Sequence, residues 1–304
     1  MKLETNNKIC IGAGLVSLDI LMRGYEETVS YKVGGTCGNV MMILAYMGWD
    51  SYPVARLNGS EQSQMMLDDM RVNGVHTDFV SRLEDGATPI IIQHNIIDKD
   101  GNPTHKFTFQ GNRGSLHLDY KPVMKKTAMK VLDELSFQPM VFFFDRVSAA
   151  TLAMAEHFKG TDCLVFFEPS ARAKASDFAK AVANSDIIKF ADQRLPGVGF
   201  TEAYRDKLFI QTLGSKGLRF NLFGSGWQSL PPVTNDNVVD TSGAGDWTSA
   251  AFLNEMAERS MATTSEMTVA SVAEMLSKAQ EKASQSCSYE GARGMMQKIR
   301  TLNS

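Results

Sequence analysis

Four short apolar runs in the middle of the chain constrain its fold more than any other feature. They span residues 140–144, 164–167, 186–190 and 208–213, at intervals of about 20 residues, with helix-favouring stretches between them. Strands that are apolar on both faces and alternate with helices form a parallel sheet covered on both sides. Right-handed crossovers then predict an open, doubly wound α/β sheet with helices on both faces.

Polar residues stand where several of these strands end. Asp145, Glu168, Asp192 and the run 212–214 each follow an apolar run. In open α/β sheets the ligand crevice lies outside the carboxyl ends of the strands, so we expect these residues to share one rim. A carboxylate at a strand end can also simply cap the next helix, and the pattern alone leaves both interpretations open.

A different pattern occupies the segments 89–97 and 105–110. They alternate apolar and polar residues on either side of a polar, glycine-containing turn, which predicts an antiparallel hairpin. One face of such a hairpin is not in the main core. We therefore predict a small β lid, contributed by about residues 20–34 and 88–112, on a single domain that spans the whole chain.

The overall composition excludes several classes of protein. Lysine and arginine number 31 against 34 aspartates and glutamates, for a net charge of −3, and no polybasic tract is present. Neither a nucleic-acid partner nor a membrane partner is expected. No apolar run approaches the ~18 residues of a membrane span. Glu4 and nearby glycines break the N-terminal apolar stretch, unlike a secretory signal, so a cytoplasmic location is predicted.

The first of two glycine-rich loops follows the predicted strand 8–11. Gly12 and Gly14 approximate the dinucleotide fingerprint, with Ser17 in place of the third glycine. That fingerprint also needs a helix, a second strand and a later acidic residue. The segment 23–28 provides neither a good helix nor a following apolar strand, so a dinucleotide oxidoreductase is the weaker alternative.

The second glycine-rich loop reads DTSGAGD from Asp240 to Asp246 and precedes a predicted helix. Small residues at a helix N-terminus let backbone N–H groups converge on an anion. The backbone of Gly243, Ala244 and Gly245 is therefore the candidate anion hole. Asp246 falls in the first helical turn, where it could act as a base on a hydroxyl while the hole stabilises a transferring phosphoryl group. The simpler alternative is a helix cap.

These residues resemble the ribokinase-like (PfkB) family of carbohydrate kinases. The run 240–246 resembles that family's D-T-x-G-A-G-D signature, and Gly34-Gly35-Thr36-Cys37-Gly38-Asn39 resembles its G-G-x-x-x-N signature. Asp19 matches the substrate-binding aspartate of the family. The lid hairpin, the strand-end pair 168–169, the run 212–217 and the pair 291–292 follow in family order, so the resemblance covers essentially the whole chain.

The resemblance implies a kinase that moves the γ-phosphoryl group of ATP to a hydroxyl of a sugar or sugar derivative. Asp246 would be the general base, and the lid would close over the substrate to exclude water. Mg²⁺ would accompany ATP, and dependence on a monovalent cation is left open. Two lids could also pair in a homodimer. The residues implied to bind substrate hydroxyls are Asp19, Gly34, Gly35 and Asn39. Those implied to border the nucleotide are Thr212, Gly214, Gly217, Asp240, Thr241 and Gln280.

The chain departs from the family pattern at two informative places. Residues 191–194 read Ala-Asp-Gln-Arg where the family usually has N-x-x-E, which helps to organise magnesium. Asp192 or Glu168 could compensate, indirectly through water or phosphate. Alternatively, the chain is a weak or inactive member that senses a sugar or nucleotide. Arg113 stands where many relatives read G-A-N, and there it could pair with an anionic group of the substrate.

Overall fold

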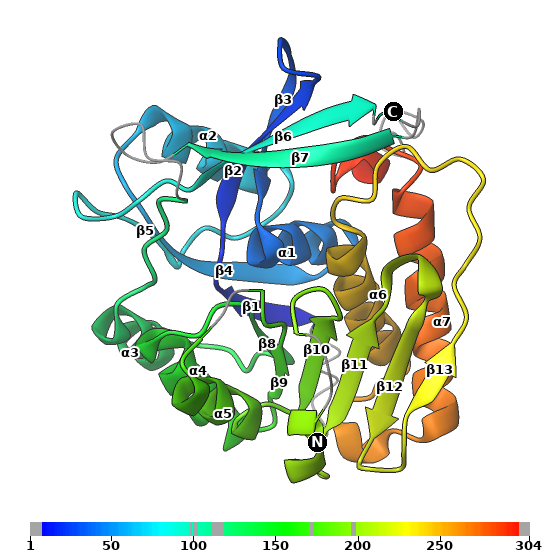
Figure 1. Cartoon of the computed structure of the whole chain (residues 1–304). Coiled ribbons are helices and arrows are strands. Elements are labelled where there is room, and N and C mark those ends of the chain that lie inside the picture. The colour runs from blue at the N-terminus through cyan, green and yellow to red at the C-terminus, as the bar shows by residue number, and fades with distance from the viewer. Residues whose placement is uncertain are drawn as a thin grey trace.

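The computed structural model of the chain describes residues 8–97, 99, 103–110, 118–170, 173–195 and 199–297. These residues form two sheets, a large one that carries the core and a smaller one above it (Figure 1). Among the described residues, no helix combines the length and the apolar composition that a membrane crossing would need.

The large sheet has nine strands in the order β13-β12-β11-β10-β9-β8-β1-β4-β5. Neighbouring strands pair in parallel except at one edge, where β12 is antiparallel to both β11 and β13. The strands are β1 Ile9–Ala13, β4 Asp50–Leu57, β5 Val80–Arg82, β8 Val141–Phe144, β9 Leu164–Phe167, β10 Ile187–Ala191, β11 Leu208–Thr212, β12 Leu218–Leu222 and β13 Gln228–Leu230. The predicted doubly wound, mostly parallel sheet is confirmed.

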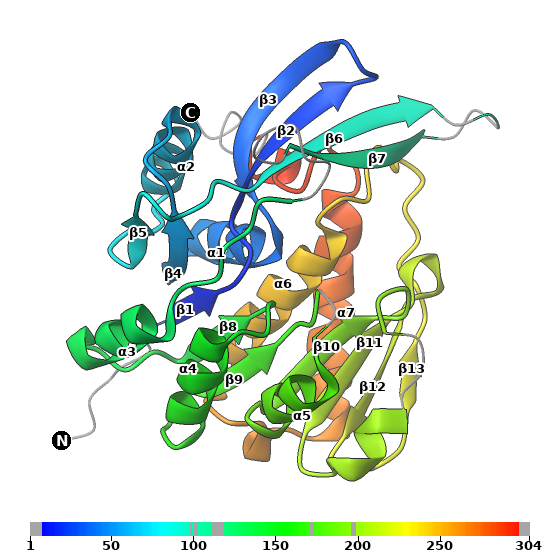
Figure 2. The ribbon, with the colours of Figure 1, turned by 60° about the vertical axis from the view of Figure 1, so that its left-hand side comes forward.

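Helices cover both faces of this sheet, because its central strands are apolar on both sides (Figure 2). Phe143 and Phe166 point to the face packed by α1, α6 and α7, whereas Phe142, Phe144 and Phe167 point to the face packed by α3, α4 and α5. The helices are α1 Thr36–Tyr46, α2 Glu61–Val72, α3 Lys125–Glu134, α4 Ala149–Lys159, α5 Ala175–Ala183, α6 Ala244–Glu258 and α7 Val269–Ser286, with short 3₁₀ turns at Gly199–Ala203, Gly214–Lys216 and Thr264–Glu266.

The small sheet forms the lid. Its strands, in the order β3-β2-β6-β7, are β2 Ser17–Arg23, β3 Glu27–Gly34, β6 Ile90–Ile97 and β7 Pro103–Gln110. β6 and β7 form the predicted antiparallel hairpin, and β2 pairs with β6 in parallel. Figures 1 and 2 show the lid over the carboxyl ends of the central strands, the edge at which an α/β sheet binds its ligands.

An ion pair between the buried Arg293 and the partly buried Asp69 anchors the base of the lid. Arg293 donates two hydrogen bonds to the carboxylate of Asp69 in α2, at 2.7 and 2.9 Å, and a third to the backbone carbonyl of Val33 in β3, at 3.2 Å. A bidentate guanidinium–carboxylate pair fixes orientation as well as distance. The C-terminal segment, α2 and the lid are therefore held as one unit.

The helices begin in two different ways. Side chains close the N-termini of α4 and α7, where Ser148 and Thr268 form reciprocal capping boxes. In contrast, α1 and α6 begin at Gly35 and Gly243, which have φ of 76° and 78° and offer no side-chain cap. No side chain therefore competes for the first-turn N–H groups of these two helices, although Gly38 N–H of α1 donates to the Leu15 carbonyl at 3.1 Å and Ala244 N–H of α6 donates to the Thr241 carbonyl at 3.3 Å.

Candidate active site

The N-termini of α1 and α6 meet at a hydrogen bond between two buried side chains. Asn39 Nδ2 donates to Asp246 Oδ2 at 2.7 Å, across a separation of 207 residues in sequence. The amide oxygen of Asn39 is buried and has no protein partner among the described residues. It is therefore an acceptor available to a ligand hydroxyl beside the Asp246 carboxylate.

The surroundings of Asp246 make it a stronger base than an ordinary aspartate. Burial and then repulsion by Glu168 raise the pKa of Asp246 to about 8, against the opposing effects of the Asn39 hydrogen bond and the positive charges of Lys189 and Arg194. A carboxylate with a pKa in this range can take a hydroxyl proton near neutral pH, which suits general base catalysis.

Only glycine fits at position 243. Its φ lies in the left-handed region, and a Cβ there would approach the Cβ of Ala292 to 2.4 Å. The backbone carbonyl of Ala292 also accepts a 2.7 Å hydrogen bond from the indole of Trp247. The C-terminal segment therefore packs directly on the loop that opens α6.

The backbone at the start of α6 can hold an anion. The Ala244 N–H donates to the Thr241 carbonyl at 3.3 Å, which leaves the N–H groups of Gly245 and Asp246 without a partner inside the helix. The helix dipole adds partial positive charge at this end. The Ser242 hydroxyl is buried without a hydrogen-bond partner in the described chain. The expected anion hole thus has free donors, although Ala244 is engaged.

Asp19 lies on β2 of the lid and points toward the glycine pair at the end of β3. Ser17 Oγ donates to its carboxylate at 2.6 Å. A Cβ at Gly34 would lie 1.8 Å from Asp19 Oδ2, and one at Gly35 would lie 2.6 Å from the Leu15 carbonyl oxygen, so both glycines are required sterically. Burial raises the pKa of Asp19 to about 6, opposed mainly by the Ser17 hydrogen bond.

Beneath the anion hole lies an ion pair that the sequence analysis missed. Lys189 Nζ of β10 donates to Glu168, which follows β9, and Ser249 Oγ of α6 donates to the other carboxylate oxygen. A Cβ at Gly245 would lie 3.7 Å from Lys189 Nζ and 3.9 Å from Glu168 Oε1. A lysine inside the apolar run 186–190 was the signal that could have revealed this pair.

The two acidic residues proposed to help hold magnesium both have protein partners. Glu168 binds Lys189 and Ser249, and Asp192 Oδ1 accepts from Gln211 Nε2 at 2.8 Å. The part of the chain that the structure describes contains no group of three or more His, Cys, Asp or Glu side chains able to hold a metal ion. These residues fit a Mg²⁺ carried mainly by phosphate oxygens and water, rather than a protein-built cage.

Four of the residues expected around the nucleotide lie near β11 and β12, whereas Asp240 and Thr241 lie in the loop before α6. Thr212 ends β11, and its carbonyl accepts from the Asp192 N–H at 3.0 Å. Gly214 and Gly217 bracket the next turn with φ of 61° and 88°. Gln280 of α7 donates to the Pro231 carbonyl at 3.4 Å, and the Gly217 backbone packs against the same proline. Gly217 and Gln280 are therefore neighbours.

The Asp240 side chain connects the loop to the lid. Its carboxylate accepts from Ser242 N at 2.9 Å and Gly291 N at 2.8 Å, both near the anion hole. It also accepts from Gln93 Nε2 of β6 at 2.6 Å and lies 3.8 Å from His105 Nδ1 of β7. The sequence grouped Asp240 with the nucleotide-binding residues, and the hydrogen-bonding role of Gln93 was missed.

Arg113 lies outside the described residues, so its suggested pairing with an anionic substrate stays a prediction.

The glycines of the first glycine-rich loop are explained by packing. A Cβ at Gly14 would lie 1.7 Å from Asp145 Oδ1, which accepts from the Leu15 N–H at 2.8 Å. The chain then enters strand β2 rather than the helix that a dinucleotide fingerprint needs.

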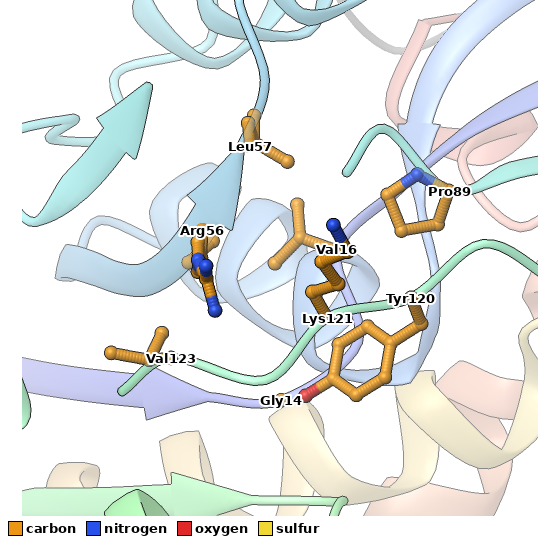
Figure 3. Close-up of a pocket in the computed structure, with 9 residues that line it drawn as sticks. Gly14, Val16, Arg56, Leu57, Pro89, Tyr120, Lys121 and Val123 are labelled. Carbon is orange, nitrogen blue, oxygen red and sulfur yellow. The ribbon is translucent and has the colours of Figure 1, made fainter. Parts of the chain in front are cut away.

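A small hollow beside this loop is separate from the Asn39–Asp246 pair. Figure 3 shows Tyr120 reaching toward Gly14, with Arg56 and Lys121 nearby. Arg56 is paired with Asp85, and Lys121 donates to the Asp85 carbonyl at 3.0 Å. Both cations thus have protein partners, and the hollow adds no free charged group to the site.

Asp246 should destabilise the fold increasingly as the pH rises. Its pKa is about 8 in the folded chain and 3.8 as the reference, so folding retains a proton that the unfolded chain releases between these values. We expect the Asp246→Asn variant to gain unfolding free energy relative to wild type from pH 4 to pH 8, and no further above pH 8. Denaturant titrations across this range measure the difference.

The exposed Asp133→Asn change on α3 controls for the loss of one negative charge. A difference between Asp246→Asn and wild type that does not change with pH would contradict the raised pKa.

Comparisons with known proteins place the chain in a family. Residues 9–299 match the profile of the pfkB family carbohydrate kinases. A probable fructokinase-5 from Arabidopsis thaliana is 24% identical over 239 residues, which cover 72% of each chain. Among solved structures, a fructokinase from Vibrio cholerae O395 bound to fructose, ADP and calcium ion superposes with a TM-score of 0.73 at 16% identity, covering 95% of this chain and 96% of that one.

An aminoimidazole riboside kinase from Salmonella enterica, complexed with aminoimidazole riboside and an ATP analog, gives a TM-score of 0.70 at 19% identity and covers 97% of this chain and 100% of its own. At these identities the structural matches establish the fold alone, whereas the family profile spans nearly the whole sequence. The chain belongs to the pfkB family of carbohydrate kinases.

Proposed function

We propose that the chain transfers the γ-phosphoryl group of ATP to a hydroxyl of a sugar or sugar derivative. The observation that carries this proposal is the Asn39–Asp246 hydrogen bond at the open N-terminus of α6. This contact brings together a candidate base, an amide oxygen that can accept a hydrogen bond from a substrate hydroxyl, and backbone N–H groups that can bind an anion. ATP-bound sugar kinases with the same fold support ATP as the donor.

The reaction follows from this arrangement. The acceptor hydroxyl gives its proton to the Asp246 carboxylate as its oxygen bonds to the γ-phosphorus, and the bond from that phosphorus to the β–γ bridging oxygen breaks to release ADP. The N–H groups of Gly245 and Asp246 face the transferring phosphoryl group and stabilise its charge. The lid excludes water, which would otherwise compete with the acceptor.

The acceptor is oriented by groups on both sides of the crevice. Asp19 and the Gly35 backbone bind hydroxyls from the lid side, and Asn39 Oδ1 accepts a further hydroxyl proton beside the base. Holding the reacting hydroxyl against Asp246 removes most of the entropy cost of the encounter.

Magnesium, when bound with ATP, neutralises charge on the phosphates. Glu168 and Asp192 would assist through water, because each is already hydrogen-bonded to the protein. Lys189, buried beneath Gly245, adds fixed positive charge below the anion hole. Such preorganised charge stabilises a transferring phosphoryl group.

A second candidate function is a sensor that binds sugar and nucleotide with little or no turnover. Arg194 favours it, since it replaces the glutamate of the family's N-x-x-E pattern. Its charge also lowers the pKa of Asp246 and so helps to ionise the base, which supports catalysis instead. The assay below separates the two, because the sensor binds ATP without releasing ADP.

Asp246→Asn should lower kcat by roughly 10²–10⁴-fold, the usual contribution of a general base, while acceptor binding survives. Wild-type kcat/KM should rise with pH through about 8, because only the ionised Asp246 can take the proton. Magnesium-dependent ADP release is measured across sugars, sugar acids, sugar phosphates and nucleosides. Full activity in Asp246→Asn would refute the assignment of the base.

Gln93→Glu should loosen the lid. The new carboxylate would lie against Asp240 in place of the 2.6 Å hydrogen bond, and facing like charges repel strongly when buried. We expect the KM of the acceptor to rise about tenfold or more. Thr104→Glu adds the same charge at an exposed position of β7, away from Asp240, and should leave KM near wild type. Equal KM values for the two variants would argue against the lid contact.

We also propose a homodimer formed through the outer faces of two lids. Ile20 of β2 lies in register with Tyr31 and Ile92, and the Tyr31 side chain is 52% exposed. Sedimentation of wild type should give a dimer at micromolar concentration, and Tyr31→Asp should shift it toward monomer. Val72→Asp, which changes an exposed apolar residue outside the lid, is the control. A monomeric wild type would contradict the proposal.

A further inference from the structure

Two phenylalanines on the edge strand of the lid face the site rather than the solvent side. His105, Phe107 and Phe109 alternate along β7 and so share one face of the sheet. His105 Nδ1 lies 3.8 Å from Asp240 Oδ1, and the His105 and Phe107 rings are 4.8 Å apart. The contact between His105 and Asp240 orients this face toward the loop that opens α6.

Strand register places one of these rings in line with the predicted substrate-binding aspartate. Asp19 pairs with Ile91, and Ile91 pairs with Phe109, so the three side chains form a row on the inner face of the lid. Neighbouring strands are about 4.8 Å apart, so Phe109 lies roughly 10 Å from Asp19 along this row. Figure 2 shows β7 at the edge of the lid opposite β3.

The two rings are uncovered although they face inward. Leu21 and Gln93, in the adjacent strands, are each only 7% exposed, whereas Phe107 is 44% and Phe109 is 39% exposed. The inner face of the lid is thus covered by protein near β2 and β6 and open along β7. A localised, uncovered apolar surface next to a ligand site indicates that a ligand covers it.

From this placement we propose that the acceptor carries a flat, apolar ring substituent, which packs on Phe107 and Phe109 while its sugar hydroxyls bind at Asp19 and Asn39. The substrate class is thus a nucleoside or an aryl glycoside rather than a free sugar. This inference rests on the proposed kinase function. A single sugar ring at Asp19 would occupy only the near part of the row and leave the aromatic part uncovered.

Other occupants fit the geometry less well. The adenine of ATP is expected beside Gly217, which precedes β12, and Gln280 of α7, and neither residue belongs to the lid. A second copy of the chain would meet the outer face of the lid, where Tyr31 is exposed, and not the inner face. Planar rings pack well on aromatic side chains in offset or edge-on geometry, with little sequence or substituent selectivity.

The test compares acceptors in matched pairs that differ only in the ring substituent: ribose with inosine, and glucose with phenyl β-glucoside. Wild-type kcat/KM should favour the ring-bearing member of at least one pair by roughly tenfold or more. Phe107→Ser and Phe109→Ser should remove most of that preference by lowering kcat/KM for the ring-bearing acceptor alone. Phe109→Leu, which keeps apolar volume without a flat ring, should fall between.

Phe223→Ser is the matched control, because Phe223 is a 38% exposed phenylalanine outside the lid. Thermal unfolding of each variant checks that the fold is retained. A wild type that prefers the free sugar in both pairs, or phenylalanine variants that keep the wild-type preference, would overturn the inference.

A binding measurement separates this inference from the proposed function. Calorimetric titration of inosine and phenyl β-glucoside into the chain does not depend on turnover. If no acceptor is phosphorylated, the kinase proposal fails, but weaker binding to Phe109→Ser than to wild type still supports the aromatic subsite. Equal binding to wild type and to Phe109→Ser overturns the aromatic subsite. So does a wild type that binds neither ring-bearing compound.

Discussion

The hydrogen bond from Asn39 to Asp246 is the contact on which the site depends. It joins the first turns of two helices that begin at glycines with positive φ and lack side-chain caps. A capping side chain at position 243 would occupy N–H groups that the proposed anion hole needs. Gly243 leaves the N–H groups of Gly245 and Asp246 free, and the amide–carboxylate bond aligns the two helices.

Charge around this contact is balanced rather than simply positive. Glu168 opposes ionisation of Asp246, while Lys189 and Arg194 favour it, and Lys189 is at the same time bound to Glu168. The proposed base therefore changes its protonation close to neutral pH, beside the proposed anion hole. The substitution of arginine for the family's usual glutamate at position 194 adds to the cationic side of this balance, so it need not mark a loss of function.

The fold and the two helices that follow the glycine motifs could be predicted from the sequence, because they depend on local patterns. These patterns are apolar runs of strand length and small residues before a helix. The sequence could not predict contacts across hundreds of residues, such as the one between Asn39 and Asp246. Lys189 was hidden because it lies within an apolar strand, where only its ion pair with Glu168 makes it tolerable. In the sequence, Gln93 is one of several polar residues that alternate with apolar ones in a predicted hairpin. Only the tertiary fold shows that its side chain donates a hydrogen bond to Asp240.

The ion pair between Arg293 and Asp69 affects the order in which the parts of the site can form during synthesis of the chain. Asp69 and Val33 leave the ribosome more than 220 residues before their partner, as the sequence separations of 224 and 260 show. During synthesis the lid strands and α2 therefore exist without the group that fixes them, and Ala292, which packs on Gly243, arrives equally late. Because such long-range contacts form late, the crevice is completed only after residues 292 and 293 have been synthesised. Until then, the proposed substrate site and the proposed anion hole are both incomplete.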